Sequence, residues 1–309
     1  MTDFIHEPVL LEEALSALQP TAGRLYVDGT VGGGGHAEAI LEASGPDGRL
    51  VGFDRDDRAI AAAAMRLARF GDRVTLHREA FSGLAKRLTK VGCDGVLLDL
   101  GVSSPQLDEP GRGFSFQDDG PLDMRMDRRQ PVTAEQLVNE LESDELATIF
   151  WELGGERRSR RIARAIVEQR GMQRLETTTQ LADTVERACP RRGARTHPAT
   201  GVFQALRMAV NEELSQARFG LDAAWSVLKP GGRLAVITFH SGEDRLVKQF
   251  SRGLAKPYTV RGEVDVPELR EPREPLAREL NRRAIKPSAA ELERNPRSRS
   301  AQLRALEKL

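Results

Sequence analysis

The stretch Asp28-Gly29-Thr30-Val31-Gly32-Gly33-Gly34-Gly35-His36 decides how the first part of this chain folds. It follows the apolar run 24–27 and leads into a helix-compatible segment at 37–43. A strand, a glycine turn and a helix in this order present backbone N–H groups beside a ligand-sized crevice. A second apolar run, 50–53, ends in Asp54, at the spacing of about 20 residues where an acid meets a ribose hydroxyl. Together, the turn and the acid predict a site for a nucleoside-containing cofactor.

Strand and helix signals alternate through the first hundred residues. Apolar runs predict strands at 25–27, 50–53, 74–76 and 95–98, and the segments 59–70 and 81–91 between them have helical character. Continuous apolar strands separated by helices favour a parallel sheet that is covered on both faces. The next strand of this type, 233–239, follows a Lys-Pro-Gly-Gly turn at 229–232. The sheet is therefore interrupted by a long insertion.

The insertion has mostly helical patterns. Capping boxes are predicted at 133–136 and 177–180. Two apolar stripes at helical spacing follow, one through Ile162, Ala165, Ile166 and Gln169, the other through Phe203, Leu206, Val210 and Leu214. We expect residues 125–210 to form a helical substrate-recognition domain, inserted into an α/β cofactor-binding domain made of residues 1–124 and 211–309. Beyond it, 256–275 is predicted to be an exposed loop, and 284–286 with 301–306 a hairpin at the sheet edge.

The composition excludes several classes of protein. With 46 basic and 46 acidic residues the formal charge is zero, so net charge alone indicates no polyanionic partner. The two cysteines and five histidines have no ligand spacing, so no metal site is predicted. The first residues lack signal-peptide character, and no apolar run approaches the roughly 20 residues that span a bilayer. A cytoplasmic protein without a membrane segment is the expectation.

Polar residues cluster after three of the predicted strands. They occur at 28–36, at 99–106 and at 239–245, and the middle segment combines Asp99 with Ser103 and Ser104. In open parallel sheets, ligands bind beyond the carboxyl ends of the strands. The acid before the glycine turn and the Lys-Pro-Gly-Gly turn resemble class I S-adenosylmethionine-dependent methyltransferases. That resemblance implies a Rossmann-like, doubly wound, mostly parallel sheet.

A narrower resemblance covers nearly the whole chain and rests on eight blocks in order. The sequence is similar to the RsmH (MraW) family at His6-Glu7-Pro8-Val9-Leu10-Leu11, 28–36, 94–108, Arg112-Gly113-Phe114-Ser115-Phe116, Leu122-Asp123-Met124-Arg125-Met126, Phe203-Gln204-Ala205-Leu206-Arg207, 239–245 and Asn295-Pro296-Arg297-Ser298-Arg299-Ser300. The resemblance implies methylation of the N4 atom of a cytidine in the decoding region of 16S ribosomal RNA, on the small ribosomal subunit.

The resemblance also implies which residues contact S-adenosylmethionine: Gly34, Gly35, His36, Asp54, Phe81, Asp99 and Gln106. Asp54 would accept hydrogen bonds from the ribose hydroxyls, and Phe81 would pack on the adenine. His36 opens the helix after the glycines, so we expect its backbone N–H to make the contact. Gly201 stands where the family pattern usually has an arginine, so a guanidinium contact is not expected there.

Methyl transfer to an amine needs alignment and hydrogen-bond acceptors more than a covalent nucleophile. Asp99 is the candidate catalytic acceptor, and Ser103, Ser104, His240 and Ser241 are candidates for holding the base. Arginines gather in two zones, at 157–195 and at 282–304, and phosphate contacts from such zones give affinity for RNA. Arg157, Arg158 and Arg161 are the RNA-binding candidates of the first zone.

Other functions remain open on sequence alone. One is a class I methyltransferase that acts on another RNA base or on protein. Another is a ribosome-assembly factor with a vestigial cofactor pocket. A nicotinamide oxidoreductase ranks last because no residue set for hydride transfer is evident. The sequence does not define the oligomeric state, and a homodimer is kept as a candidate.

Overall fold

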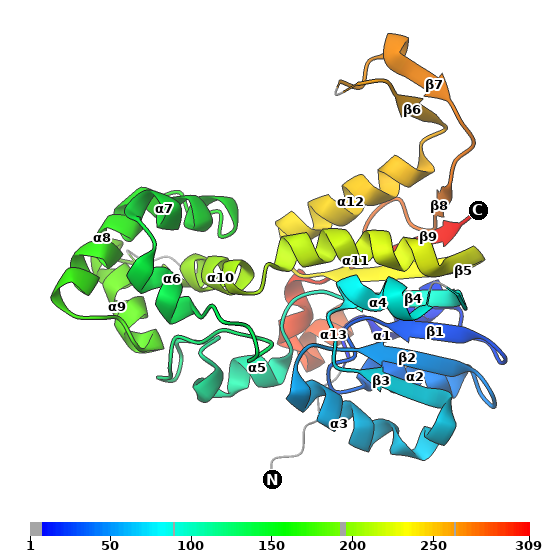
Figure 1. Ribbon diagram of the computed structural model, residues 1–309, viewed down its shortest axis with the longest axis horizontal. Coiled ribbons are helices and arrows are strands. Elements are labelled where there is room, and N and C mark those ends of the chain that lie inside the picture. Colours follow the sequence, from blue (N-terminus) through cyan, green and yellow to red (C-terminus); the bar gives the residue numbers. More distant parts are fainter. Residues whose placement is uncertain (1–7, 89, 192–195, 263) are drawn as a thin grey trace. The chain divides into compact units, whose positions relative to one another are not determined.

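The computed structural model describes residues 8–88, 90–191, 196–262 and 264–309 (Figure 1). The chain divides into two compact units. The first consists of the chain up to residue 101 together with 214–309, and the second of residues 102–213. Each unit has its own hydrophobic core.

A sheet of seven strands forms the centre of the first unit, among its described residues. Its order is β3-β2-β1-β4-β5-β9-β8, and the strands are β1 (Leu25–Asp28), β2 (Arg49–Phe53), β3 (Val74–His77), β4 (Cys93–Asp99), β5 (Leu228–Thr238), β8 (Ala277–Glu279) and β9 (Gln302–Lys308). β1 to β5 are mutually parallel, whereas β9 runs antiparallel to both β5 and β8. The predicted mostly parallel sheet, including the late strand after the insertion, is confirmed.

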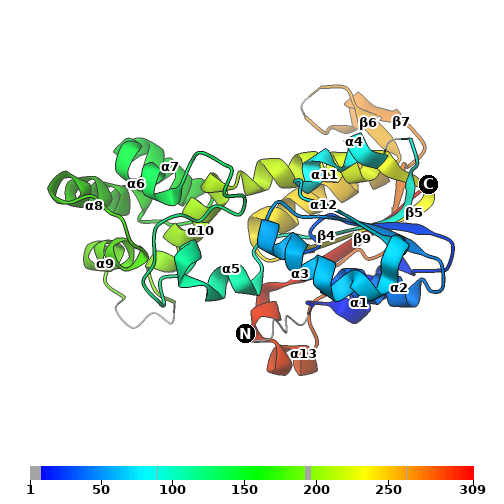
Figure 2. The same ribbon diagram turned by 60° about the horizontal axis from the view of Figure 1, so that its bottom comes forward.

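Helices cover both faces of this sheet because successive strand residues point to opposite sides. Leu25 and Val27 pack into one core with α4 (Leu84–Leu88), α11 (Glu213–Val227) and α12 (Ser241–Ala255). Tyr26 packs into the other with α1 (Leu11–Leu18), α2 (Gly35–Ala43) and α3 (Asp57–Leu67). Figure 2 shows α1, α2 and α3 together on one side of the strands. The first unit is therefore a doubly wound, class I methyltransferase-like layer structure.

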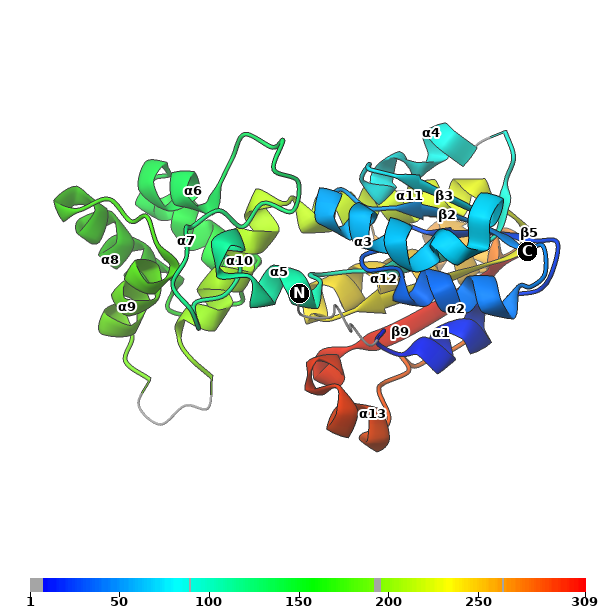
Figure 3. The same cartoon turned by 90° about the horizontal axis from the view of Figure 1, so that it is seen from below.

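The end of the chain differs from two of the predictions. The segment 256–275 is not only a loop, because β6 (Tyr258–Val260) pairs antiparallel with β7 (Arg270–Pro272). The hairpin predicted between 284–286 and 301–306 is not formed. At the sheet edge β9 pairs with β8, and residue 285 makes only an isolated bridge to β9. α13 (Ala289–Arg294) precedes β9, and α1 lies beside β9 (Figure 3).

The second unit is helical, as predicted for the insertion. Its helices are α5 (Ser104–Asp108), α6 (Ala134–Glu140), α7 (Ser143–Glu152), α8 (Ser159–Met172), α9 (Thr178–Ala188) and α10 (Ala199–Val210). Short 3₁₀ turns complete both units: η1 (Ala68–Arg73), η2 (Phe81–Gly83), η3 (Pro110–Arg112), η4 (Pro267–Leu269) and η5 (Pro296–Ser300). Both predicted capping boxes are present, at the starts of α6 and α9.

The two predicted apolar stripes belong largely to the core of the second unit. Ile162 and Ile166 of α8 are fully buried, and Phe203, Leu206 and Val210 line one face of α10. Leu214 does not continue that stripe, because α10 ends at Val210 and Glu212 adopts a left-handed backbone with φ 49°. Here sequence periodicity ran through a helix break that only the backbone conformation reveals.

A buried asparagine fixes the chain at the end of α10. Asn211 accepts a hydrogen bond from the N–H of Met126 at 2.8 Å and donates to the carbonyl oxygen of Met124 at 2.7 Å. Met124 has φ 60°, an unfavourable conformation for a residue with a side chain. These hydrogen bonds offset that cost within the second unit.

Among the described residues, none of the helices combines the length and the apolar character that a bilayer-spanning segment requires. Cys93 and Cys189 are both buried and unbridged.

Candidate active site

The parallel strands bring three acidic residues to one edge of the sheet. Asp28 ends β1, Asp54 follows β2, and Asp99 ends β4. β1 pairs with both neighbours in register, since Asp28 lies opposite Gly52 on one side and Leu97 on the other. The topology therefore places these carboxyls side by side at the carboxyl ends of the strands, where open α/β sheets bind their ligands.

The glycine turn leads from β1 into α2. Gly34 caps the helix with φ 83°, a left-handed conformation that favours glycine, whereas a Cβ there would make only an ordinary contact with the backbone of Ala63 at 3.4 Å. The first turn of α2 begins at Gly35 and His36, at the same edge as the three acids. N–H groups of a helix's first turn have no partner inside the helix and suit negatively charged or polar ligand atoms. The side chain of His36 lies close to the carbonyl oxygen of Val9, with Nε2 at 2.9 Å.

Asp54 ties the glycine turn to the start of α3. One carboxylate oxygen accepts from the N–H of Gly32 at 3.0 Å and the other from the N–H of Asp56 at 2.9 Å. Burial raises the pKa of Asp54, and these two hydrogen bonds oppose that rise. The position beyond β2 is the one expected for an acid that accepts from ribose hydroxyls.

Phe81 lies between two glycines. A Cβ on Gly220 of α11 would stand 2.1 Å from its ring, and a Cβ on Gly29 would be 3.0 Å from its Cβ. The ring therefore packs directly on the backbone of α11, which holds it in place at the start of η2. Sequence reasoning missed Gly220, although a glycine inside a helix often marks a close approach of this kind.

Asp28 and Asp99 share one neighbour, Thr30. The N–H of Thr30 donates to Oδ1 of Asp28 at 3.1 Å, and its hydroxyl oxygen accepts from the N–H of Asp99 at 2.6 Å. Burial raises the pKa of Asp28 to about 7, and the charge of Asp54 adds to that rise. The pKa of Asp99 is also raised well above its usual range. Burial is the main cause, and the charges of Asp28 and Glu243 add to the rise. Neither Asp28 nor Thr30 was among the predicted site residues, although both stand in the glycine-turn motif.

The third predicted polar segment forms the start of α12. Nδ1 of His240 accepts from the N–H groups of Gly242 and Glu243 at 3.2 and 3.3 Å, and its Nε2 lies 3.1 Å from a carboxylate oxygen of Glu243. Nδ1 is thus occupied in capping the helix, whereas the buried Nε2 accepts or donates no hydrogen bond among the described residues. Ser241 is exposed on the first turn. Glu243, which is only 2% exposed, is the residue of this segment that acts electrostatically on Asp99.

Three predicted residues belong to the second unit. Ser103 caps α5, Ser104 begins it, and both are half-buried. Gln106 is buried, and its carbonyl oxygen accepts from the N–H of Ser103 at 3.1 Å.

The arginines of the second unit fall into two kinds. Arg170 donates to the carbonyl oxygens of Val138 and Leu141, and Arg174 pairs with Glu135 at 2.6 Å, so both support the fold. Arg157, Arg158 and Arg161 are exposed where α8 begins. Arg158 lies 3.6 Å from Glu156, and no ion pair within the described residues involves the other two. Arg192 and Arg195 lie outside the described residues.

For one arginine of the C-terminal basic zone, Arg304, the prediction of an RNA contact is wrong. Arg304 is only 8% exposed, and its guanidinium is paired with the carboxylate of Asp244 at 2.7 and 3.1 Å. Both faces of β9 are covered, since Leu303, Arg304 and Ala305 are all buried.

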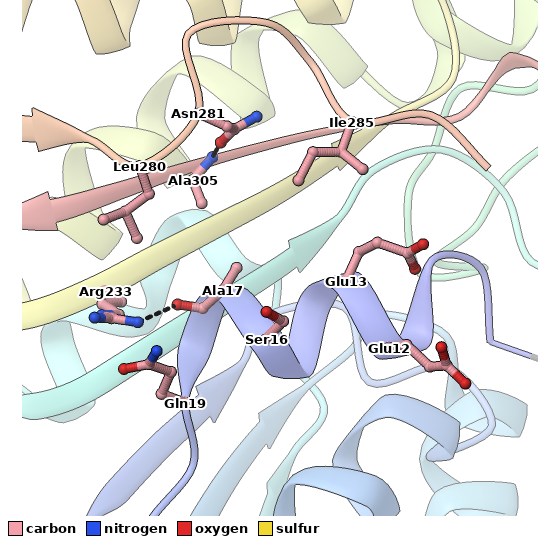
Figure 4. Close-up of a pocket in the computed structure, with 10 residues that line it drawn as sticks. All are labelled: Glu12, Glu13, Ser16, Ala17, Gln19, Arg233, Leu280, Asn281, Ile285 and Ala305. Atoms are coloured by element: carbon pink, nitrogen blue, oxygen red, sulfur yellow. Dashed lines mark hydrogen bonds between the residues drawn. The ribbon is translucent and has the colours of Figure 1, made fainter. Parts of the chain in front are cut away.

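A separate hollow of about 470 Å³ lies in the first unit, between α1 and the strand β5 (Figure 4). It is lined by Glu12, Glu13, Ser16, Ala17, Gln19, Arg233, Leu280, Asn281, Ile285 and Ala305. Arg233 donates to the carbonyl oxygen of Ala17, and the amide of Asn281 is hydrogen-bonded to backbone groups. Because Arg233 stands well before the end of β5, the hollow is distinct from the edge that carries Asp28 and Asp99.

Gly201, where an arginine was expected, lies in α10 against the end of α7. A Cβ on Gly154 would come within 2.4 Å of the carbonyl oxygen of Gly201, so the two backbones touch there. Where the family pattern has an arginine, this chain therefore has a close backbone contact between α10 and the end of α7.

Comparison with known proteins gives a full-length match. The chain is 52% identical over 311 residues to Ribosomal RNA small subunit methyltransferase H of Symbiobacterium thermophilum, covering 99% of this chain and 97% of the relative. It is 50% identical to the protein of that name from Geotalea uraniireducens, with both covered completely, and 52% identical to that from Xanthomonas euvesicatoria, covering 98% and 89%. An rRNA methylase structure from Streptococcus thermophilus is 11% identical with a TM-score of 0.44, covering 97% and 93%. Residues 3–309 match the model of the MraW methylase family, and the chain belongs to that family.

Proposed function

We propose that this protein transfers a methyl group from S-adenosylmethionine to the N4 amine of a cytidine in the decoding region of 16S ribosomal RNA. The observation that carries the proposal is the similarity of about 50% over the full length to enzymes named for methylation of small-subunit ribosomal RNA. Small ribosomal subunits are the substrate, and the bacterial cytoplasm is where the reaction takes place.

The residues at the carboxyl edge of the sheet fit this cofactor. S-adenosylmethionine supplies an electrophilic methyl group on a positively charged sulfur. Asp54 would accept from the ribose hydroxyls, and the ring of Phe81 would pack on the adenine. The first-turn N–H groups of Gly35 and His36, following Gly34, would meet polar cofactor atoms. One buried oxygen of Asp28 and one of Asp99 have no hydrogen-bond partner within the described part of the chain, which suits a ligand that brings positive charge.

Asp99 is our candidate for the catalytic acceptor. The lone pair of cytidine N4 is delocalised into the ring, so the protein must align the amine and accept its N–H groups as positive charge develops. When N4 bonds to the methyl carbon, the carbon–sulfur bond breaks with its electron pair on sulfur, and N4 loses a proton. A carboxyl whose pKa is raised well above its usual range is a stronger base than an ordinary carboxylate, so in its ionised form it can take that proton.

The second unit, which contains the predicted recognition domain 125–210, is proposed to bind the RNA. The support is the exposed arginine cluster at the start of α8, where Arg157 and Arg161 have no acidic partner among the described residues. Unbalanced guanidinium groups bind phosphates and release counterions. Ser103, Ser104 and Ser241 remain candidates for contacting the base, which must be unpaired or flipped to be reached. His240 is a weaker candidate because its imidazole caps α12.

The reaction is tested with small subunits that lack the modification. The protein and isotopically labelled S-adenosylmethionine are incubated with them, the RNA is digested, and its nucleosides are separated by mass spectrometry. Labelled N4-methylcytidine is the expected product. Label on another nucleoside or on protein would support a different class I methyltransferase, and binding to subunits without any transfer would support an assembly factor.

Asp99→Asn keeps the size of the side chain but removes its capacity to accept a proton. We expect turnover on small subunits to fall by about 10²-fold or more, which is the usual contribution of general acid–base catalysis. Full turnover in this variant, with unchanged cofactor affinity, would refute the catalytic assignment.

Arginine variants separate RNA binding from cofactor binding. Replacing Arg157 and Arg161 together by alanine should weaken subunit binding and lower the dependence of log affinity on log salt by about 1 to 2, at roughly 0.7–0.9 per phosphate contact. Arg174→Ala is the matched control, because its charge is already balanced by Glu135. Charge reversal at Arg157, Arg158 and Arg161 should have a larger effect. Loss of cofactor binding in these variants would contradict the proposed division of labour.

A further inference from the structure

Two carboxyl groups at the cofactor edge, the buried Asp28 and the partly exposed Asp99, each have a buried oxygen without a hydrogen-bond partner among the described residues. Oδ2 of Asp28 and Oδ1 of Asp99 are both inaccessible to water and accept no hydrogen bond among the described residues. Asp28 is only 1% exposed. An ionised Asp28 lacks hydration there and, among the described residues, a counter-charge, which is a costly arrangement, and an ionised Asp99 is hydrated on only part of its carboxyl.

Among the described residues that act on this pair, two acids add negative charge and one histidine lies near it. Asp54, at the end of β2, acts on Asp28, and Glu243, from α12, acts on Asp99, so both bring further negative charge. From α2, Nδ1 of His36 lies 3.9 Å from Oδ2 of Asp99. Nε2 of His36 donates to the carbonyl oxygen of Val9, and Nδ1, at 3.9 Å, lies beyond hydrogen-bond distance of Asp99. This nitrogen therefore gives the carboxyl of Asp99 no hydrogen bond.

Thr30 connects the two carboxyl groups. Its hydroxyl oxygen accepts from the N–H of Asp99 at 2.6 Å, and both its N–H and its hydroxyl interact with the carboxyl of Asp28. One residue therefore sets the position of both acids. Like charges held close together in a buried site favour a state in which only one of the two groups is ionised.

We propose that Asp28 and Asp99 hold one proton between them in the cofactor-free protein and release it to solvent when the positive charge of S-adenosylmethionine enters the site. The inference rests on the proposed cofactor site and makes Asp28 and Thr30 positioning residues for it. The ionised pair is then able to take the proton that N4 loses during transfer. Because the sulfur is neutral after transfer, the pair holds that proton more strongly at the end of the reaction than at its start.

Calorimetry measures the proton directly. S-adenosylmethionine is titrated into the full-length protein at pH 7 in buffers with different ionisation enthalpies, and the slope of binding enthalpy against buffer enthalpy gives the protons exchanged. We expect the wild-type protein to release between about 0.5 and 1 proton per cofactor, and Asp28→Asn to release less than half of the wild-type value. Asp94→Asn, at the other end of β4, is the matched control and should release as many protons as the wild type.

A second pair of variants covers the case in which Asp28→Asn does not fold. Thr30→Val removes the hydroxyl at nearly constant size and should reduce proton release, whereas Thr30→Ser should restore it. Infrared difference spectra give an independent signal, since a protonated-carboxyl band should disappear when the cofactor binds.

The outcomes separate this inference from the proposed function. Cofactor binding without proton release, or equal release by the wild type and Asp28→Asn, would overturn the shared proton and leave the cofactor site intact. Failure of the wild-type protein to bind S-adenosylmethionine would overturn both.

Discussion

Replacing Asp28 by asparagine should make the cofactor-free protein more stable at neutral and alkaline pH. The folded protein keeps the proton of Asp28 up to about pH 7, whereas the unfolded chain loses it near its ordinary pKa of 3.8. The folded state thus binds more protons between these values, so the free energy of unfolding falls as pH rises through this window. At about 1.36 kcal/mol per pKa unit, the loss for the wild type reaches about 4 kcal/mol.

Asparagine cannot ionise, so Asp28→Asn should not show this fall. Its amide oxygen can still accept from the N–H of Thr30, which keeps the existing hydrogen bond. Relative to the wild type, we expect the variant to gain roughly 2–4 kcal/mol between pH 4.5 and pH 8. This gain would come with weaker cofactor binding, the usual exchange of function for stability at a strained site.

Urea unfolding followed by tryptophan fluorescence measures this difference in the unit concerned. The chain has two tryptophans; Trp151 belongs to the second unit and is 58% exposed, and Trp225 belongs to α11 of the first. In a Trp151→Phe background the signal therefore reports the first unit. Asp94→Asn is the control. Burial raises the pKa of Asp94, but hydrogen bonds from Leu25, Arg24 and Lys229 outweigh it and lower the pKa below its ordinary value of 3.8. The stability that Asp94 contributes is lost only as pH falls through and below that value, so the difference between this variant and the wild type should stay nearly constant from pH 4.5 to 8.

A stability difference between wild type and Asp28→Asn that stays constant from pH 4.5 to 8 would refute the reasoning. A stability gain of Asp28→Asn over the wild type that is larger at pH 4.5 than at pH 8 would refute it as well.

Three further substitutions test other parts of the structure. Asp54→Asn should weaken S-adenosylmethionine binding, measured by calorimetry, by about 10- to 100-fold. The reason is that hydrogen bonds to a charged acceptor contribute about 1.5–3 kcal/mol. An unchanged affinity would show that the ribose lies elsewhere. Gly220→Ala should lower cofactor affinity and thermal stability, because the new Cβ would stand 2.1 Å from the ring of Phe81. In an exposed helix the same substitution would stabilise the protein by about 1 kcal/mol. A higher melting temperature of the variant would contradict this packing. Asn211→Ala should cost about 2–4 kcal/mol in urea unfolding of the second unit, because it leaves buried backbone groups unpaired. A cost below about 0.5 kcal/mol would show that these hydrogen bonds are dispensable.

The parallel sheet was predictable because each of its strands is a continuous apolar run. The runs at 25–27, 50–53, 74–76 and 95–98 lie within observed strands, and the run at 233–239 extends one residue beyond β5, which ends at Thr238. Strands of three residues, such as β6, β7 and β8, carry no periodic signal, and their pairing depends on contacts distant in sequence. The helix break after Val210 was missed for a related reason, because apolar spacing continues across a backbone turn.

The site was predictable only in outline. Parallel topology alone brings acids at strand ends to one edge, so Asp54 and Asp99 could be placed from the sequence. Burial of Asp28, the bridging role of Thr30 and the close approach of Gly220 depend on side-chain packing and carry no pattern of their own. The same holds for Arg304, which sequence alone assigned to a basic surface and the structure places in a buried ion pair.

The most direct test of the proposed cofactor site is a crystal structure of the protein with S-adenosylhomocysteine, the demethylated cofactor. We predict electron density for the nucleoside with its ribose hydroxyls on Asp54, its adenine against Phe81, and its amino-acid end beside Asp28 and Asp99. Density in the hollow between α1 and β5, with the strand-end carboxyls untouched, would contradict the assignment.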